Sequence, residues 1–166
     1  MGRRRPAKYR HMLDEDVPVW EAWLSRYGDP TATYSYDVKV GKGITPDPNI
    51  STALQELGIG LTKKRIDVVE SGPYHTRIIE VKRLAGLSSI AQLVGYPILY
   101  MATFNPTIIP TPCLIAERLL LDVEMMLKTL QIEYYVIPPC EQLTAETVQA
   151  RSSGEPNQNT EIPGEI

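Results

Sequence analysis

Two short apolar segments near the middle of the chain carry ionisable residues where a buried β-strand normally has only aliphatic side chains. Residues 65–69 contain Asp67, and residues 78–82 contain Glu80 and end at Lys82. Side chains alternate between the two faces of a strand, so Glu80 and Lys82 should point the same way. Burying such groups is costly unless they are paired or bind a metal ion. These two segments therefore constrain the fold more than any other part of the sequence.

A turn-forming sequence at residues 71–74 separates the two segments and predicts that they are neighbouring antiparallel strands. In that pairing Asp67 can lie beside Glu80. Two adjacent carboxylates repel each other, and a divalent cation is the usual compensation. Oxygen ligands of this kind suit Mg²⁺ or Mn²⁺ better than Zn²⁺. We therefore expect a magnesium or manganese site between the two strands.

The order of these residues resembles the motif of the PD-(D/E)XK nuclease superfamily, which includes restriction enzymes, resolvases and recombination exonucleases. The motif consists of an Asp, a later Glu-X-Lys, and a helix that carries Gln and Tyr four residues apart. It matches Asp67, then Glu80 with Lys82, then Gln92 with Tyr96. The resemblance covers residues 17–137, which is most of the part expected to fold.

The resemblance implies a restriction-endonuclease-like α/β fold, an αβββαβ core whose central mixed sheet is flanked by helices. It also implies metal-dependent hydrolysis of DNA phosphodiesters, with Mg²⁺ or Mn²⁺ as the cofactor. The residues it assigns to catalysis are Asp67, Glu80, Lys82, Gln92 and Tyr96. The metal ligands it implies are Asp67, Glu80, the carbonyl group of Val81, and Glu21.

The sequence departs from the family motif in two places. Ile66 precedes Asp67 where the family commonly has Pro, and Pro97 lies inside the helix that carries the Gln and Tyr. The motif also leaves open which acidic residue of the first helix is the outer metal ligand. We take Glu21 for this role, with Glu15 as the alternative.

Apolar periodicity and turn residues predict the other elements. The Trp20 and Trp23 pair is interpreted as core, and Gly58 with Gly60 is expected to end a short helix. A later helix should begin at Ser88 as its N-cap and bury an apolar stripe over residues 90–101. The expected helices cover residues 14–27, 50–57, 88–101 and 119–130, and the expected strands cover residues 33–40, 65–69, 78–82, 113–116 and 133–137.

Charge is distributed unevenly along the chain. Five of the first ten residues are basic, whereas the residues from 139 onward contain five Glu and one Arg. A basic arm suggests an anionic partner, either nucleic acid or an acidic protein surface, although a solvated tail is the alternative. The expected DNA-contacting residues are Arg3, Arg4, Arg5, Lys8, Arg10, Lys63, Lys64 and Arg65. The last three could instead be charges that protect a strand edge.

The 166 residues, 43% of them apolar, suffice for one domain with a core. We expect a basic arm at residues 1–13, the domain at 14–138 and an extended polar tail at 139–166. No apolar run reaches the ~18 residues of a membrane helix, and no apolar leader is present, so a cytoplasmic protein is expected. The two His and two Cys are too scattered for a zinc site, and His75 is interpreted as a loop residue.

Two other functions remain open at this stage. The chain could be a structural protein of the neck or head-completion region of a bacteriophage particle, with weak or no catalysis. Both tails would then contact other protein subunits, and the chain would belong to the virion in an infected bacterial cell. Alternatively, the domain could bind DNA without cutting it.

Overall fold

The computed structural model describes residue 9 and residues 11–138. Within them the chain forms four helices and five strands. In chain order these are α1 (Val17–Tyr27), β1 (Thr33–Val40), α2 (Thr52–Thr62), β2 (Lys64–Ser71), β3 (Thr76–Ala85), α3 (Leu87–Phe104), β4 (Thr111–Leu119), α4 (Leu121–Thr129) and β5 (Glu133–Val136). The predicted order of elements is confirmed, including the short helix between the first two strands.

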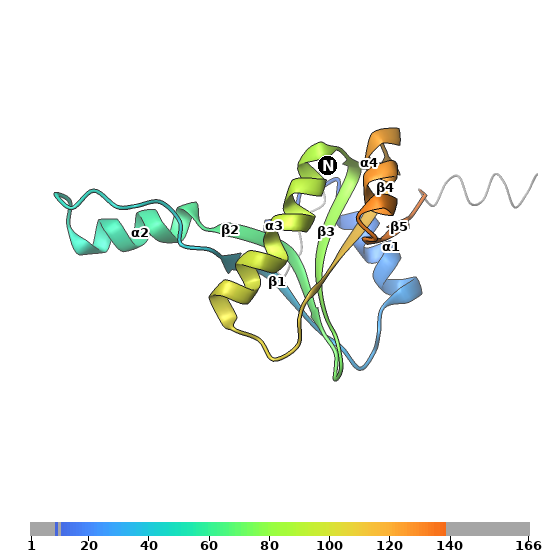
Figure 1. Ribbon diagram of the computed structural model, residues 1–166, viewed down its shortest axis with the longest axis horizontal. Coiled ribbons are helices and arrows are strands. Elements are labelled where there is room, and N and C mark those ends of the chain that lie inside the picture. Colours follow the sequence, from blue (N-terminus) through green and yellow to red (C-terminus); the bar gives the residue numbers. More distant parts are fainter. Residues whose placement is uncertain (1–8, 10, 139–166) are drawn as a thin grey trace, which may run out of the picture.

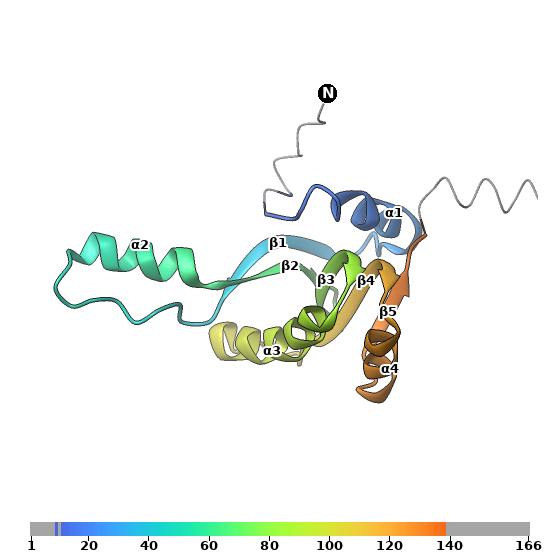
Figure 2. The same cartoon turned by 90° about the horizontal axis from the view of Figure 1, so that it is seen from above.

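The five strands form one mixed sheet in the order β1-β2-β3-β4-β5. The first three pair antiparallel, whereas β3, β4 and β5 pair parallel. Parallel neighbours need a crossover connection, which α3 and α4 provide. Helix α1 covers one face of the sheet, and α3 and α4 lie on the other (Figure 2). The predicted α/β class, with an αβββαβ core around a mixed sheet, is therefore confirmed.

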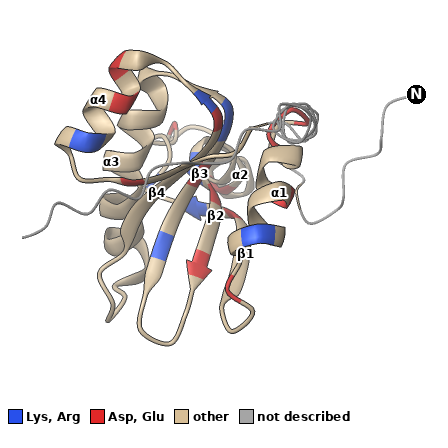
Figure 3. Ribbon diagram, turned by 90° about the vertical axis from the view of Figure 1, so that its right-hand side faces the viewer, with Lys and Arg blue, Asp and Glu red and all other residues tan. Residues whose placement is uncertain are grey.

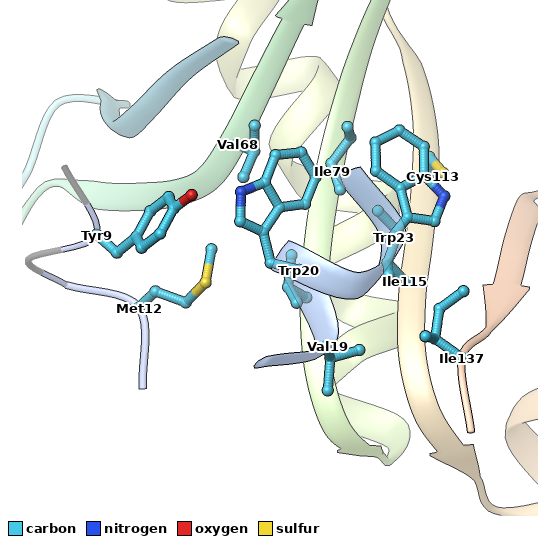
Figure 4. Packing of buried hydrophobic residues seen from close by; sticks show 11 residues of the cluster. Tyr9, Met12, Val19, Trp20, Trp23, Val68, Ile79, Cys113, Ile115 and Ile137 are labelled. Carbon is cyan, nitrogen blue, oxygen red and sulfur yellow. The ribbon is translucent and has the colours of Figure 1, made fainter. Parts of the chain in front are cut away.

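Two tryptophans of helix α1 pack against the face of the sheet that this helix covers. Trp20 and Trp23 have no exposed surface, and their rings stack with centroids 5.2 Å apart. They pack against Val68 of β2 and Ile79 of β3 (Figure 4). The core interpretation of the pair is confirmed. Tyr9, from the segment assigned to the basic arm, is also buried in this cluster.

The prediction for α2 was wrong at its C-terminal end. The helix runs through Gly58 and Gly60 and ends at Thr62. A helical glycine costs only about 1 kcal/mol relative to alanine, so glycines alone do not end a helix. The side chain of Ser51 caps its N-terminus by accepting a hydrogen bond from the backbone N–H of Leu54. With its preceding loop, α2 projects away from the sheet (Figure 1), and none of its residues is buried.

Helix α3 also differs from the prediction. Its N-cap is Gly86, and Ser88 lies inside the first turn. The helix continues through Pro97, and only part of the predicted apolar stripe is buried. Val94 and Ile98 are 47% and 58% exposed, so the buried face of the helix is narrower than predicted. By length and composition alone α3 could cross a membrane, but in this fold it packs on β3 and β4.

Two further predicted boundaries, in the parallel half of the sheet, were wrong. Strand β4 covers Thr111–Leu119 rather than residues 113–116, so Leu119 ends a strand and α4 begins at Leu121. Helix α4 buries Val123 and Leu127 against the sheet. Pairing with β3 along its whole length extends β4 beyond its apolar centre.

Two leucines of α4 provide a matched test of this packing. Leu127 is fully buried, whereas Leu121 is 86% exposed. We expect Leu127→Ala to lower the free energy of unfolding by about 2–5 kcal/mol, because the substitution leaves a cavity. Leu121→Ala should change it by less than about 0.5 kcal/mol. Urea unfolding followed by tryptophan fluorescence measures both values, and equal effects would contradict the described burial.

Candidate metal-dependent active site

The antiparallel pairing of β2 and β3 brings the two acidic residues together. Val68 lies opposite Ile79, which puts Asp67 beside Glu80 in the same register. The Oδ2 atom of Asp67 accepts a hydrogen bond of 3.0 Å from the backbone N–H of Val81. This bond fixes the Asp67 carboxylate against the neighbouring strand. The expectation that the two segments form a hairpin is confirmed by the pairing.

Lys82 joins this pair because it lies two residues after Glu80 on the same face of β3. Its Nζ atom is 2.7 Å from Glu80 Oε1 and 3.5 Å from Asp67 Oδ2. A third carboxylate is close, since Asp16 Oδ2 lies 4.0 Å from the same nitrogen. One ammonium group therefore faces three carboxylates. The three residues singled out from the sequence converge on one place.

Asp16 is the member of this group that sequence reasoning missed. It is the N-cap residue of α1, but its side chain makes no capping hydrogen bond. Its Oδ1 atom instead accepts a 2.6 Å bond from the backbone N–H of Arg83. The carboxyl group is 2% exposed, and burial raises its pKa. Only its position in an acidic run before the helix pointed to it.

Glu21 and Glu15, the two residues considered for this role, have exposed side chains. Glu21 lies in the second turn of α1, away from the helix end that meets β3. Glu15 lies 3.5 Å from the guanidinium of Arg83 in an exposed ion pair. Among the residues that the structure describes, the acidic side chain of the first helix region that reaches Lys82 is Asp16.

The pKa of the Glu80 carboxyl group is strongly raised. It is 1% exposed, and burial together with the charge of Asp67 raises its pKa to about 8. Apart from the ion pair with Lys82, no hydrogen-bond donor among the described residues meets either of its oxygens. A buried carboxylate oxygen without a donor is suited to bind a cation. The donor set of Asp67, Glu80 and Asp16 therefore fits a divalent ion such as Mg²⁺ or Mn²⁺.

Burial and neighbouring charges also shift the pKa values of Asp67 and Lys82. Burial also raises the pKa of Asp67 above its ordinary value, although Lys82 and the Val81 N–H oppose this shift. Burial lowers the pKa of Lys82, but the charges of Asp67 and Glu80 outweigh it and raise the pKa overall. Lys82 is therefore a permanent cation at neutral pH.

Gln92 and Tyr96, the helix residues of the motif, lie one turn apart on α3. The amide Nε2 of Gln92 donates a hydrogen bond of 3.0 Å to the hydroxyl oxygen of Tyr96. Burial raises the pKa of Tyr96, and the charges of Glu80 and Asp67 raise it further. The phenol is therefore within electrostatic range of the acidic group, although no direct contact joins them among the described residues.

Two hollows flank the site. One, of about 180 Å³, is bordered by Asp67, Arg65 and His11, and the other, of about 240 Å³, by Asp16, Lys82 and Arg118. Each combines a member of the acidic group with basic residues. The site can thus be approached from two sides.

The expected DNA-contacting residues are only partly described. Lys64 is exposed at the start of β2, Lys63 is half-buried at the end of α2, and Arg65 pairs with Asp37. The basic residues Arg3, Arg4, Arg5, Lys8 and Arg10 lie outside the described residues, as does the polar tail from residue 139. Their roles stay predictions.

A second group of possible metal ligands was not predicted. Asp29, Glu70 and His75 place their ligand atoms within 4.8 Å of one another. Asp29 lies far from the other two in the sequence, and His75 does lie in the loop between β2 and β3, as interpreted.

Comparison with known proteins gives distant structural likenesses. No protein-family model and no curated protein matches the sequence. A repair endonuclease from Pyrococcus abyssi is similar in structure, with a TM-score of 0.44, 12% identity, and coverage of 74% of this chain and 46% of that one. The structure of EndoMS in a complex with double-stranded DNA is also similar, with a TM-score of 0.44 and 15% identity. That comparison covers 81% of this chain and 50% of EndoMS. The chain spans about half the length of these proteins. Its function must therefore be argued from its own residues.

The raised pKa of Glu80 has a consequence for stability. Because its pKa is about 8 in the folded chain and near 4.5 in the unfolded chain, the folded state binds more protons between these values. Without divalent metal, the free energy of unfolding should fall as the pH rises from about 5 to 8, by at most a few kcal/mol. Glu80→Gln should flatten this dependence. Urea unfolding at several pH values in a chelating buffer measures it, and equal slopes for both proteins would contradict the assignment.

Proposed function

We propose that this domain is a nuclease that hydrolyses phosphodiester bonds in DNA with the help of Mg²⁺ or Mn²⁺. The observation that supports the proposal most is the convergence of Asp16, Asp67 and Glu80 on the ammonium group of Lys82. Three buried or half-buried carboxylates with one cation leave negative charge that a divalent ion would balance.

In this proposal Asp67 and Glu80 hold the metal, and Asp16 is the outer acidic ligand. The carbonyl group of Val81 stays a predicted ligand. When bound, the metal polarises the phosphate and lowers the pKa of a bound water. The hydrogen bond from Val81 N–H to Asp67 keeps that carboxylate oriented while the substrate binds. Asp67 and Glu80 thus present their carboxylate oxygens to the metal from two paired strands.

Lys82 offsets the negative charge that develops on the phosphate in the transition state. The raised pKa of Lys82 argues against a role as a general base, since the amine keeps its proton at neutral pH. A protonated amine can donate hydrogen bonds to a phosphate oxygen or to the attacking water. Gln92 and Tyr96 act as positioning residues on the α3 side, because their hydrogen bond orients the phenol near the acidic group.

The hollows beside the site supply a path for the DNA backbone. His11 and Arg65 border one, and Arg83 and Arg118 border the other. Phosphates on either side of the bond being cut would meet these basic groups. Lys64 and the basic arm would add affinity that is independent of sequence and sensitive to salt.

The structural role in a bacteriophage particle remains the alternative. It was suggested by the polar tail, which lies outside the described residues, and no described residue favours it. In that role the same domain would dock against other subunits, and the acidic group would be a residual feature. Catalysis is the property that separates the two proposals.

DNA cleavage tests the proposed site directly. We expect the wild-type chain to nick supercoiled plasmid with Mg²⁺ or Mn²⁺, and a chelator to abolish the nicking. Lys82→Gln and Asp67→Asn should each lower the rate at least about 100-fold, because each removes charge from the reacting centre.

Asp16 and Glu21 provide a matched pair for the same assay. Asp16→Asn should reduce nicking strongly, whereas Glu21→Gln should leave it unchanged. All variants need unfolding curves near wild type to be informative. If Lys82→Gln nicks as fast as wild type, this site does not cut DNA, and equal losses for Asp16→Asn and Glu21→Gln would refute the role of Asp16.

The basic border of the second hollow gives a separate prediction for binding. Arg118 is 61% exposed and lies at the hollow, so Arg118→Ala should weaken DNA binding with little effect on stability. The slope of log affinity against log salt should fall by about one unit. Arg26→Ala, near the far end of α1, is the control and should change neither quantity. Fluorescence anisotropy with labelled DNA measures both, and identical slopes would exclude Arg118 from the interface.

A further inference from the structure

The group formed by Asp29, Glu70 and His75 lies on the other face of the sheet from the candidate active site. Glu70 follows Asp67 by three positions on β2, so its backbone lies roughly 10 Å farther along the strand and its side chain points to the opposite, α1 face of the sheet. Asp29 comes from the loop between α1 and β1, and His75 from the loop between β2 and β3. Figure 3 shows an acidic segment at the end of β2 beside a basic segment of the neighbouring strand.

Hydrogen bonds and ion pairs orient both carboxylates of this group. Asp29 Oδ1 accepts two hydrogen bonds of 2.7 Å, from the backbone N–H and the hydroxyl of Thr31. Glu70 has no exposed surface, and its Oε2 is 3.1 Å from the guanidinium of Arg77. Its other oxygen, Oε1, accepts a hydrogen bond of 3.4 Å from the hydroxyl group of Tyr34 and lies 3.4 Å from His75 Nε2. The two acidic side chains are therefore oriented before any ligand arrives.

His75 supplies the imidazole of the group. Its side chain is 36% exposed, but the Nε2 atom is buried and lies 3.4 Å from Glu70 Oε1, without a hydrogen bond to any residue that the structure describes. Gly72 makes room for the imidazole, since a Cβ atom there would lie 2.3 Å from His75 Cε1. A buried ring nitrogen aimed at two carboxylates has the chemistry of a metal ligand.

The local charge also favours a cation. Asp29, Glu70 and Glu133 are acidic, and Arg77 is the basic residue that bridges the last two at 3.1 Å each. These three carboxylates therefore share one arginine. A divalent ion would balance this charge and satisfy the buried nitrogen.

We propose that Asp29, Glu70 and His75 bind a transition-metal ion of the Zn²⁺ type as a structural site. One imidazole and two carboxylates suit Zn²⁺ better than Mg²⁺, which prefers oxygen ligands only. The ligand atoms lie within 4.8 Å of one another, so a single ion can lie between them. The ion would tie the α1–β1 loop to the β2–β3 loop.

Zinc titration of the full chain in magnesium-free buffer tests this site. We expect isothermal titration calorimetry to show one tightly bound Zn²⁺ per chain, and Zn²⁺ to raise the melting temperature, since the ion binds the folded state. Mg²⁺ at the same concentration should not compete. His75→Ala should weaken zinc binding at least about 100-fold, and Asp29→Asn should weaken it at least about 10-fold without disturbing the bonds to Thr31.

Two control variants separate this site from the rest of the molecule. His11→Ala removes the only other histidine of the chain, and Asp67→Asn alters the candidate active site. Both should retain zinc binding. The proposal is overturned if wild type binds no Zn²⁺, if His75→Ala binds it as tightly as wild type, or if either control loses it. The nuclease proposal does not depend on this outcome.

Discussion

The burial of Glu80 beside Asp67 is the constraint on which the rest of the candidate site depends. A carboxylate with 1% exposure next to a second carboxylate is unfavourable unless its charge is compensated. Lys82 supplies one positive charge, at 2.7 Å from Glu80, but Asp67 and Asp16 also face it. A proton on Glu80 or a divalent cation must balance the remainder. Binding of a divalent ion at this site would therefore displace the proton from Glu80.

The sheet makes this arrangement rigid. Glu80 and Lys82 share one face of β3, which is paired on both sides, by β2 and by β4. Asp67 is tied to the same strand by the N–H of Val81. Asp16 accepts a short hydrogen bond from the backbone N–H of Arg83, the residue of β3 that follows Lys82. Strand β3 therefore fixes all the acidic groups through its backbone or its side chains, and no flexible loop has to order them.

The two groups of possible metal ligands solve the same physical problem differently. Around Glu80 the ligands are carboxylates with a lysine, which suits a hard ion that takes part in chemistry. Around Glu70 they include an imidazole, and Arg77 holds one carboxylate oxygen in place. Both buried glutamates lie on neighbouring strands, but on opposite faces of the sheet. A proposed catalytic ion and a proposed structural ion could therefore bind without sharing a ligand.

The sequence by itself determined what depends on local periodicity. The alternation of side chains put Glu80 and Lys82 on one face, the turn at residues 71–74 made the hairpin, and the spacing of Trp20 and Trp23 predicted their burial. The order of the elements along the chain and the α/β class followed from the same patterns. Helix ends were less well predicted, because the penalty for Gly58 and Gly60 is small compared with the cooperativity of the helix.

Only the tertiary structure decided which distant residues meet. Periodicity could not choose Asp16 over Glu21, because both are acidic residues of one helix region and the choice depends on which end of α1 reaches β3. Likewise, Asp29 and His75 are separated by two strands and a helix in the sequence, and sheet pairing brings them together at Glu70. Side-chain alternation is a local property of the backbone, whereas contacts between separate elements are set by how the whole core packs.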